Sequence, residues 1–352
     1  MTTSGNSEGN LAAILPSLKA SLSIQSLPIP TPGPGELLIK VSLISLNAIE
    51  AKIALQAPFP VPYPAILGFS FSGTIEAVGS NGTAWKLGGK VLVSKGFTTL
   101  GNEYAAYQRY VLVCAPEKMV ARIPSSCDGS EEEVLVGMLM NAVSVPGLFS
   151  GRLGLRHPGQ SGEAEKKVLV YGGTSSMGRL SIAYLSQAGY TVTATSSHAH
   201  CDAIHSLGAK NVILHTDHAD KVTESLKISG PYDIVVDMIS SSQTIDITSQ
   251  VLAAQGGGKL YAMQPYFEEG VEELPEGVTR VFEPWPKSLY EEGNEGLAEW
   301  VTEEYLPHGI EKGWMAGQPV EKVQGGLKGI GGVLEKVLQG NGGKRLVVDP
   351  WE

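Results

Sequence analysis

The segment Val168–Gly178 constrains the fold of this chain more than any other. It places an apolar strand before a turn of small residues and the start of a helix. Gly173, Ser175 and Gly178 stand at the three positions of a GxGxxG pattern, whose glycines allow a tight turn, approach to a pyrophosphate and close helix–strand packing. The backbone N–H groups of residues 175–178 would point at the phosphates, where the helix dipole favours negative charge. A plain strand–helix–strand unit without a ligand is the alternative.

The same alternation of strands and helices continues after this turn. A helix is expected over Gly178–Ala188 and another over His200–Leu207. The expected strands are Val168–Tyr171, Thr191–Thr195, Val212–Leu214, Ile234–Val236 and Lys259–Ala262. Strands that alternate with helices predict an α/β fold with a doubly wound parallel sheet.

The end of the second strand bears on the choice of dinucleotide. NAD-specific sites usually carry an acid there, but the chain reads Thr-Ser-Ser-His-Ala-His over 195–200, with no acid before Asp202. Hydroxyl and imidazole groups can donate to a 2′-phosphate, so the sequence favours NADP(H); an ordinary polar turn is the alternative. The predicted cofactor contacts are Gly173, Thr174, Ser175, Ser176, Met177, Ser196, Ser197, His200 and His215.

The first third of the chain follows another pattern, in which short apolar runs are separated by glycine and proline. The runs Glu36–Val41, Thr74–Val78, Lys90–Val93 and Tyr110–Val113 are expected to be strands. Such a series predicts a small barrel or curled sheet. Further along, helices are expected over Glu131–Asn141 and Val333–Leu338, and a final strand over Arg345–Val348.

Composition excludes several classes of function. Lys and Arg number 26 against 36 Asp and Glu, a net charge of −10, which argues against a nucleic-acid partner. No uninterrupted apolar run approaches the roughly 20 residues of a membrane helix, so no membrane span is expected. Met1–Asn10 is polar without basic residues, unlike a targeting segment. The three cysteines show no CxxC spacing, which argues against a disulfide framework and favours a reducing, cytoplasmic location.

Along nearly its whole length the chain resembles the medium-chain dehydrogenase/reductase superfamily. The likeness is carried by the segments Pro32–Val41, Asn47–Lys52, Pro64–Gly68, Gly73–Gly79, Ser206–Ala209 and Gly343–Val348. It implies a GroES-like β-barrel catalytic domain over residues 1–135 and 310–352. Residues 136–309 would form a Rossmann domain that binds NADP(H).

Within the superfamily the chain is most similar to the zinc-free, enoyl reductase-like branch. That branch includes quinone oxidoreductase-like proteins and the trans-acting enoyl reductases of fungal polyketide pathways. Gly325–Leu327 and Ser196-Ser197 carry this likeness. Zinc-dependent alcohol dehydrogenases have Gly-His-Glu where this chain has Gly68–Ser70, and the cysteine expected near Asn47 is missing. The ligand count therefore predicts no catalytic metal.

The resemblance implies an enzyme in which NADPH reduces an activated C=C bond of an enone, enoyl thioester or quinone. Its substrate would be a small molecule or a carrier-bound acyl group. Lys52 is the predicted group for carbonyl polarisation, with a solvent-facing lysine as the alternative. Asn141 stands where relatives often place threonine beside the nicotinamide. Pro58 or Phe59 stands near the place of a proton-donating tyrosine, and Tyr63 comes a few residues later.

Two further expectations concern function and assembly. The missing tyrosine motivates an alternative function, a non-redox scaffold that binds a polyketide-like substrate and promotes cyclisation or isomerisation. A monomer is predicted because Pro284 and Pro286 follow the presumed edge segment Val278–Glu283. The acidic residues of the loop before it, Glu268, Glu269, Glu272, Glu273 and Glu276, would repel their copies across a two-fold axis.

Overall fold

The computed structural model describes residues 9–58, 60–80, 85–96, 99–114, 119–162, 165–265 and 273–352. The chain folds into two compact units. The barrel unit comprises residues 1–140, 302–307 and 317–352. The parallel-sheet unit comprises residues 141–301 and 308–316.

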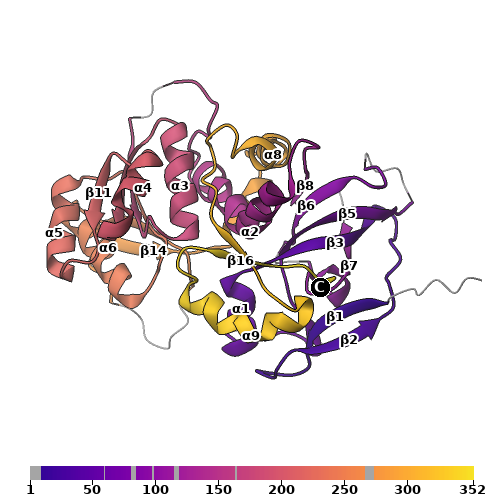
Figure 1. The fold of residues 1–352 in the computed structure, drawn as a ribbon. Coiled ribbons are helices and arrows are strands. Elements are labelled where there is room, and N and C mark those ends of the chain that lie inside the picture. The colour runs from indigo at the N-terminus through magenta and orange to yellow at the C-terminus, as the bar shows by residue number, and fades with distance from the viewer. Residues whose placement is uncertain are drawn as a thin grey trace, which may run out of the picture. The chain divides into compact units, whose positions relative to one another are not determined.

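The barrel unit is built from mainly antiparallel strands (Figure 1). Its strands are β1 (Asn10–Leu15), β2 (Ser23–Leu27), β3 (Glu36–Leu46), β4 (Ala65–Ile66), β5 (Ser70–Val78), β6 (Lys90–Ser94), β7 (Tyr110–Cys114), β8 (Met119–Arg122), β15 (Val320–Lys322) and β16 (Arg345–Val348). Among the described residues, one sheet has the order β15-β16-β3-β5-β6-β8, with β7 also paired to β3, and a smaller sheet has the order β2-β1-β4. The strands expected in the first third of the chain all lie in the larger sheet.

Helices α1 (Ala48–Leu55) and α9 (Gly326–Gln339) pack against each other in this unit (Figure 1). Helix α9 begins at Gly326, earlier than the predicted start at Val333. Its buried side chains Leu327, Ile330 and Leu334 share one face of the helix, and they join the core of the barrel unit. This buried face explains why the helix extends across glycines that by composition favour a turn.

The parallel-sheet unit has the predicted doubly wound architecture. Its strands are β9 (Lys167–Tyr171), β10 (Thr191–Ser196), β11 (Asn211–Leu214), β12 (Ile234–Asp237), β13 (Gly258–Ala262) and β14 (Val278–Val281). Its main helices are α3 (Ser176–Gln187), α4 (Cys201–Ser206), α5 (Ala219–Ser229) and α6 (Ser242–Ala254). In the described residues the strand order is β11-β10-β9-β12-β13-β14, and every pairing is parallel.

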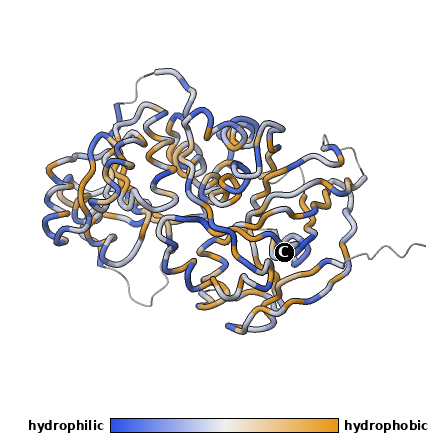
Figure 2. Tube along the Cα trace, in the orientation of Figure 1, coloured by the Kyte–Doolittle hydropathy of each residue, from blue (hydrophilic) through white to orange (hydrophobic). Residues whose placement is uncertain are grey.

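Burial explains the composition of the central strands. Val168, Leu169 and Val170 of β9 are each fully buried, as expected for a parallel strand covered by helices on both faces. Figure 2 shows hydrophobic residues along these strands and hydrophilic residues toward the outer turns. The α/β fold class predicted from the sequence is confirmed.

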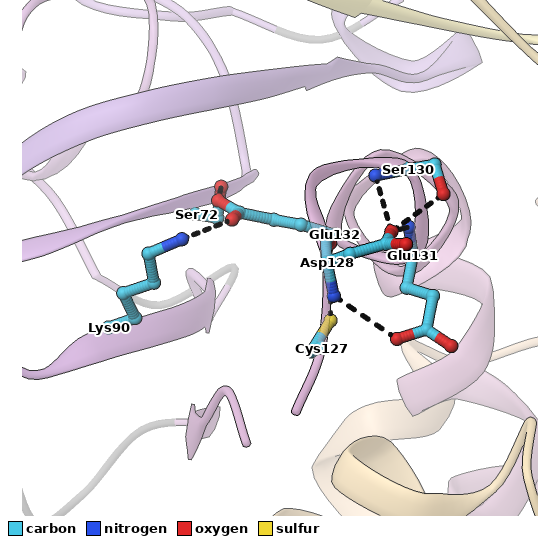
Figure 3. A network of polar contacts seen from close by, with 7 residues as sticks. All are labelled: Ser72, Lys90, Cys127, Asp128, Ser130, Glu131 and Glu132. Atoms are coloured by element: carbon cyan, nitrogen blue, oxygen red, sulfur yellow. Dashed lines mark hydrogen bonds and ion pairs between the residues drawn. The ribbon is translucent and has the colours of Figure 1, made fainter. Parts of the chain in front are cut away.

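Helix α2 (Gly129–Pro146) begins with a reciprocal cap, drawn in Figure 3. The Asp128 carboxylate accepts hydrogen bonds from the N–H groups of Ser130 (2.8 Å) and Glu131 (2.9 Å), and Glu131 accepts from the Asp128 N–H (3.3 Å). This capping box satisfies N–H groups that the helix cannot bond internally. The helix therefore starts before Glu131, the predicted first residue.

The segment Gly129–Arg152 is long and apolar enough to cross a membrane by length and composition, with a mean hydropathy of 1.6. The sequence analysis found no uninterrupted apolar run of this length and expected no membrane span. Polar residues interrupt every apolar run in this segment. Its apolar character is therefore visible only in the hydropathy averaged over the helix. Because 72 % of its most apolar window is buried within the protein, the segment has the character of a core helix.

Strand β14 is the last strand of the parallel sheet in the described part of the chain, as predicted for the edge. It ends at Val281, so Pro284 and Pro286 lie beyond the pairing stretch. The argument that prolines interrupt this edge is therefore wrong, because residues outside the strand remove no donor from its ladder. Of the acidic residues expected to repel across the edge, Glu268, Glu269 and Glu272 lie outside the described residues.

Candidate functional site

The turn between β9 and α3 has its left-handed residue one position earlier than predicted. Gly172 has φ 84°, whereas Gly173, expected to make the tight turn, has no positive φ. The Gly172 and Gly173 N–H groups instead donate to Thr195 of β10, to the hydroxyl at 2.8 Å and the carbonyl oxygen at 2.9 Å. A side chain at Gly172 would also meet Ile239. The neighbouring strand thus holds the turn in place.

Ser175 and Gly178 hold the start of α3 against this turn. The Ser175 hydroxyl donates to the Gly172 carbonyl oxygen (2.8 Å) and accepts from the Gly178 N–H (3.0 Å), as the helix N-cap. A β-carbon at Gly178 would clash with the Gly172 carbonyl oxygen. This contact is the close helix–strand packing expected of the third glycine position. The Ser175 hydroxyl therefore shapes the turn. The N–H groups of Ser176 and Met177, which follow Thr174 in the first turn of the helix, have no acceptor within the helix.

Asn141, the predicted nicotinamide-side residue, is connected directly to this turn. Its side-chain amide donates a 2.8 Å hydrogen bond to the Ser176 hydroxyl. Both residues belong to the parallel-sheet unit. The structure thus brings together one predicted catalytic residue and the predicted phosphate-binding segment.

The remaining predicted cofactor contacts gather at the carboxyl ends of β10 and β11. Ser196 is fully buried, and its hydroxyl donates to the Ser197 carbonyl oxygen (2.9 Å). Ser197 is half-buried, whereas His200 and His215 are exposed. The His215 N–H donates to the Ser196 carbonyl oxygen at 3.0 Å, so the two strand ends are adjacent. The nearest following acid in the chain, Asp202, lies exposed on α4.

Asp237 is a candidate site residue that the sequence analysis did not name. It ends β12, beside β9, and is fully buried. One carboxylate oxygen accepts from the N–H groups of Ile239 (2.8 Å) and Ser240 (2.9 Å). The other oxygen is buried and has no hydrogen-bond partner in the described part of the chain. Burial raises the pKa of this carboxyl. The sequence could have pointed to Asp237, because it directly follows the apolar run Ile234–Val236, and ligands of doubly wound sheets bind at the carboxyl ends of the strands.

In the barrel unit, Lys52 and Glu50 share helix α1. Lys52, the predicted polarising group, is half-buried, and burial lowers its pKa. Glu50 is fully buried and accepts hydrogen bonds from the N–H groups of Asn47 and Phe69, each at 3.0 Å. Burial raises the pKa of Glu50 to about 7. Arg345 donates to the Asn47 side chain at 2.9 Å, which links the closing strand to α1.

Phe69 and Ser70 are the residues that the sequence analysis matched to the metal ligands of zinc-dependent alcohol dehydrogenases. The Phe69 N–H is used by Glu50, and the fully buried Ser70 hydroxyl has no hydrogen-bond partner in the ranges described. Across those ranges, no group of three His, Cys, Asp or Glu side chains is arranged to hold a metal ion.

The region expected to hold a proton-donating tyrosine is described in part. Phe59 lies outside the described residues, and Pro58 is half-buried. The Tyr63 hydroxyl is buried and makes no hydrogen bond to the described residues.

A cavity of about 470 Å³ lies in the parallel-sheet unit, away from the predicted contacts. Its walls come from residues 150–160 and 293–297, and they include Arg156, His157 and Asn294. None of the predicted cofactor residues lines it. The cavity is therefore separate from the residues predicted to contact the dinucleotide.

Comparisons with known proteins agree with this geometry. The alcohol dehydrogenase GroES-like domain family matches residues 33–125. The trans-enoyl reductase himH of Aspergillus japonicus is 30 % identical over 322 residues, which cover 89 % of each chain.

Solved structures show the same fold. The quinone oxidoreductase of Pseudomonas syringae pv. Tomato DC3000 superposes with a TM-score of 0.73 at 17 % identity, covering 96 % of this chain and 99 % of the other. The acetophenone reductase of Geotrichum candidum NBRC 4597, solved in complex with NAD, superposes with a TM-score of 0.66 at 18 % identity, covering 98 % of each chain. The chain belongs to the medium-chain dehydrogenase/reductase superfamily of oxidoreductases, in its enoyl reductase-like branch.

Proposed function

We propose that this protein is a zinc-independent reductase that uses NADPH to reduce an activated C=C bond. The acceptor would be an enone, an enoyl thioester or a quinone, free or carried on an acyl carrier, in cytoplasmic secondary metabolism. The observation that carries the proposal is the polar edge at β10 and β11, which holds Ser197, His200 and His215 without a carboxylate at the strand end. The name of the Aspergillus relative supports the enoyl acceptor.

The residues present fit a dinucleotide. The N-terminus of α3 follows β9 after a tight turn, so its positive dipole end and N–H groups suit a pyrophosphate. The unpartnered buried oxygen of Asp237, at the end of β12, could accept from a ribose hydroxyl. Ser197, His200 and His215 would donate to a 2′-phosphate, which a carboxylate at the same place would repel.

Bound NADPH would supply the hydride and carry the redox chemistry. The chain's own residues would bind and orient the reactants. Asn141 would fix the Ser176 hydroxyl at the phosphate turn through their hydrogen bond. Lys52 would polarise the substrate carbonyl, which stabilises the negative charge that develops there.

Metal independence belongs to the same proposal. Phenylalanine offers no ligand atom at position 69, and a catalytic zinc needs three protein ligands. We expect elemental analysis of the dialysed protein to find no stoichiometric zinc; one zinc per chain would contradict this.

Two measurements test the proposal. Calorimetric titration should show tighter binding of NADPH than of NADH, and equal or tighter NADH binding would refute the cofactor preference. NADPH should be oxidised in the presence of enone, enoyl-thioester or quinone acceptors. If NADPH binds but no acceptor is reduced, the scaffold function, in which a polyketide-like substrate is cyclised or isomerised, becomes the better account.

The cofactor preference has a specific variant. Ser197→Asp places an acid at the strand end, which should shift the preference toward NADH by repelling the 2′-phosphate. Ser206→Asp, on the exposed surface of α4, adds the same charge elsewhere as a matched control. Equal effects of the two substitutions would show that Ser197 does not contact the phosphate.

A further inference from the structure

The cavity of about 470 Å³ in the parallel-sheet unit has the size of a small-molecule site. Its walls lie wholly within this unit, and they include the apolar side chains of Leu155 and Leu297. Gly154, Gly293 and Gly296 add bare backbone to the walls, because a β-carbon at any of the three would meet only open space within 4 Å. Leucine side chains and uncovered backbone suit the faces of a flat ring system.

Hydrogen bonds hold the walls of this cavity in place. The Asn294 side-chain amide donates to the Gly151 carbonyl oxygen (3.0 Å), which ties one wall to the segment that forms the other. Ser150, another wall residue, lies in the π-helical turn Gly147–Arg152, and its hydroxyl shares a 2.6 Å hydrogen bond with the Tyr184 hydroxyl. Such turns are rare and occur frequently at functional sites. The cavity is therefore formed before a ligand arrives, as is usual for small-molecule sites.

His157 presents an unused acceptor to this cavity. Its ring stacks on Trp300 with the ring centres 3.9 Å apart, and its Nδ1 lies 2.8 Å from the Pro158 carbonyl oxygen. A carbonyl oxygen only accepts, so Nδ1 carries the proton, and burial lowers the pKa of His157, which favours the neutral ring. Nε2 then has a lone pair, and it makes no hydrogen bond within the described ranges. Neither Trp300 nor Pro158 lines the cavity, so the ring meets the cavity with its remaining surface, which includes Nε2.

Two charged side chains, Arg156 and Glu295, also line the cavity. Arg156 is half-buried; its Nη1 donates to the Ser161 carbonyl oxygen (2.9 Å), and its buried Nη2 has no hydrogen-bond partner in the described part of the chain. Glu295 is exposed, and its carboxylate accepts from the Gly293 N–H (2.9 Å). Because solvent screens an exposed charge more than a half-buried one, the charge of Arg156 outweighs that of Glu295. A neutral acceptor in a positive field favours an acidic hydroxyl over an ordinary alcohol.

We propose that this cavity is a second small-molecule site, and that it binds a planar compound with a phenolic or enolic hydroxyl. The hydroxyl donates a hydrogen bond to Nε2 of His157, and the rings pack against Leu155 and Leu297. The positive charge of Arg156 stabilises the partial negative charge on the hydroxyl oxygen. The proposal does not rest on the reductase function, because none of the predicted cofactor residues lines this cavity.

A matched pair of fluorescent ligands tests the hydrogen bond. 7-Hydroxy-4-methylcoumarin is planar and carries an acidic phenol, whereas 7-methoxy-4-methylcoumarin has a methyl group in place of the proton. At a pH below the pKa of this phenol, we expect the wild type to bind the hydroxy compound about tenfold more tightly, the effect of one hydrogen bond. His157→Phe keeps a ring on Trp300 but has no acceptor, so it should bind the two compounds equally. His218→Phe, which replaces an exposed histidine of the same unit, is the matched control and should keep the tenfold preference.

The wild type alone can overturn the proposal, whatever the stability of the variants. No saturable binding of the hydroxy compound, or equal affinities for the two coumarins, would show that the cavity does not recognise the hydroxyl. A preference that persists in His157→Phe would show that another group accepts the proton. Saturating NADPH should leave the affinity for the hydroxy compound unchanged. Displacement of the coumarin by NADPH would instead indicate binding at the dinucleotide site and would refute a separate site.

Discussion

The side-chain amide of Asn141 donates a 2.8 Å hydrogen bond to the hydroxyl of Ser176, the first residue of α3. This bond joins the end of the long helix α2 to the turn that is proposed to bind the phosphates. Because Ser176 lies at the N-terminus of α3, its orientation affects the donors that a pyrophosphate would meet. Under the proposed function, Asn141 would therefore influence cofactor binding before any effect on chemistry.

We predict that Asn141→Ala weakens NADPH binding about fivefold, the effect of losing one hydrogen bond worth about 1 kcal/mol. The measurement is calorimetric titration of the purified variant. Asn211→Ala removes a comparable side-chain bond, to Thr193 at 3.3 Å, and should leave the affinity unchanged. Equal affinities for wild type and Asn141→Ala would show that the bond does not orient the turn for the cofactor.

The buried carboxyl of Glu50 predicts a pH dependence of stability. Its pKa is raised by burial to about 7 from 4.5, so between these values the folded protein keeps a proton that the unfolded chain has lost. The free energy of unfolding should therefore fall as pH rises from about 4.5 to 7, by roughly 3 kcal/mol in total. Urea unfolding at a series of pH values measures this slope.

Glu50→Gln should flatten that slope, because the amide does not titrate. Its absolute stability should also be lower, since an amide cannot accept all the N–H groups of Asn47 and Phe69 that the carboxylate accepts. Glu76→Gln, on the exposed face of β5, is the control and should leave the slope as in the wild type. An unchanged slope in Glu50→Gln would mean that another group causes the pH dependence.

The contacts of Glu132 in Figure 3 predict that removing Glu132 and removing Lys90 lower the free energy of unfolding by different amounts. Glu132 is buried, accepts from the Ser72 hydroxyl at 2.7 Å and pairs with Lys90 at 3.1 Å. Glu132→Ala leaves the buried Ser72 hydroxyl without its acceptor, and should lower the free energy of unfolding by about 1–3 kcal/mol. Lys90→Met should cost less than about 1 kcal/mol, since the Lys90 side chain is 53 % exposed.

Urea unfolding of the single variants and of the Ser72→Ala/Glu132→Ala double variant checks these values. The double variant should lose less than the sum of the two single losses, because the two side chains share one buried bond. Glu133→Ala breaks a more exposed pair with Lys322 and serves as the control. Additive losses would indicate that the Ser72–Glu132 bond contributes no coupling.

The strands and the glycine turn could be predicted because their signals are local. Apolar runs such as Val168–Tyr171 predict buried strands from their composition alone. Gly178 follows this strand at the spacing of the GxGxxG pattern. Glu50 and Asp237 could not be assigned in the same way. Their environments depend on partners distant in sequence, such as the Phe69 N–H for Glu50, and on burial by several elements.

The helix boundaries show a second limit of local reasoning. Gly326 starts α9 although glycines favour its interruption, because burial of Leu327 and Ile330 outweighs the weak propensity. The position of the left-handed residue at Gly172 was also missed, since two adjacent glycines are locally equivalent. Hydrogen bonds to Thr195 distinguish them.

The edge strand β14 gives the last prediction, which concerns assembly. The prolines lie outside the strand, so the argument for a monomer rests on charge. Glu273 and Glu276 are exposed just before the strand, and two copies paired across a two-fold axis would bring these like charges together. We predict a monomer by light scattering at micromolar concentration in moderate salt. Glu273→Gln/Glu276→Gln should then associate more readily than Glu303→Gln/Glu335→Gln, which removes the same charge elsewhere. A dimer mass for the wild type would show that this charge does not protect the edge.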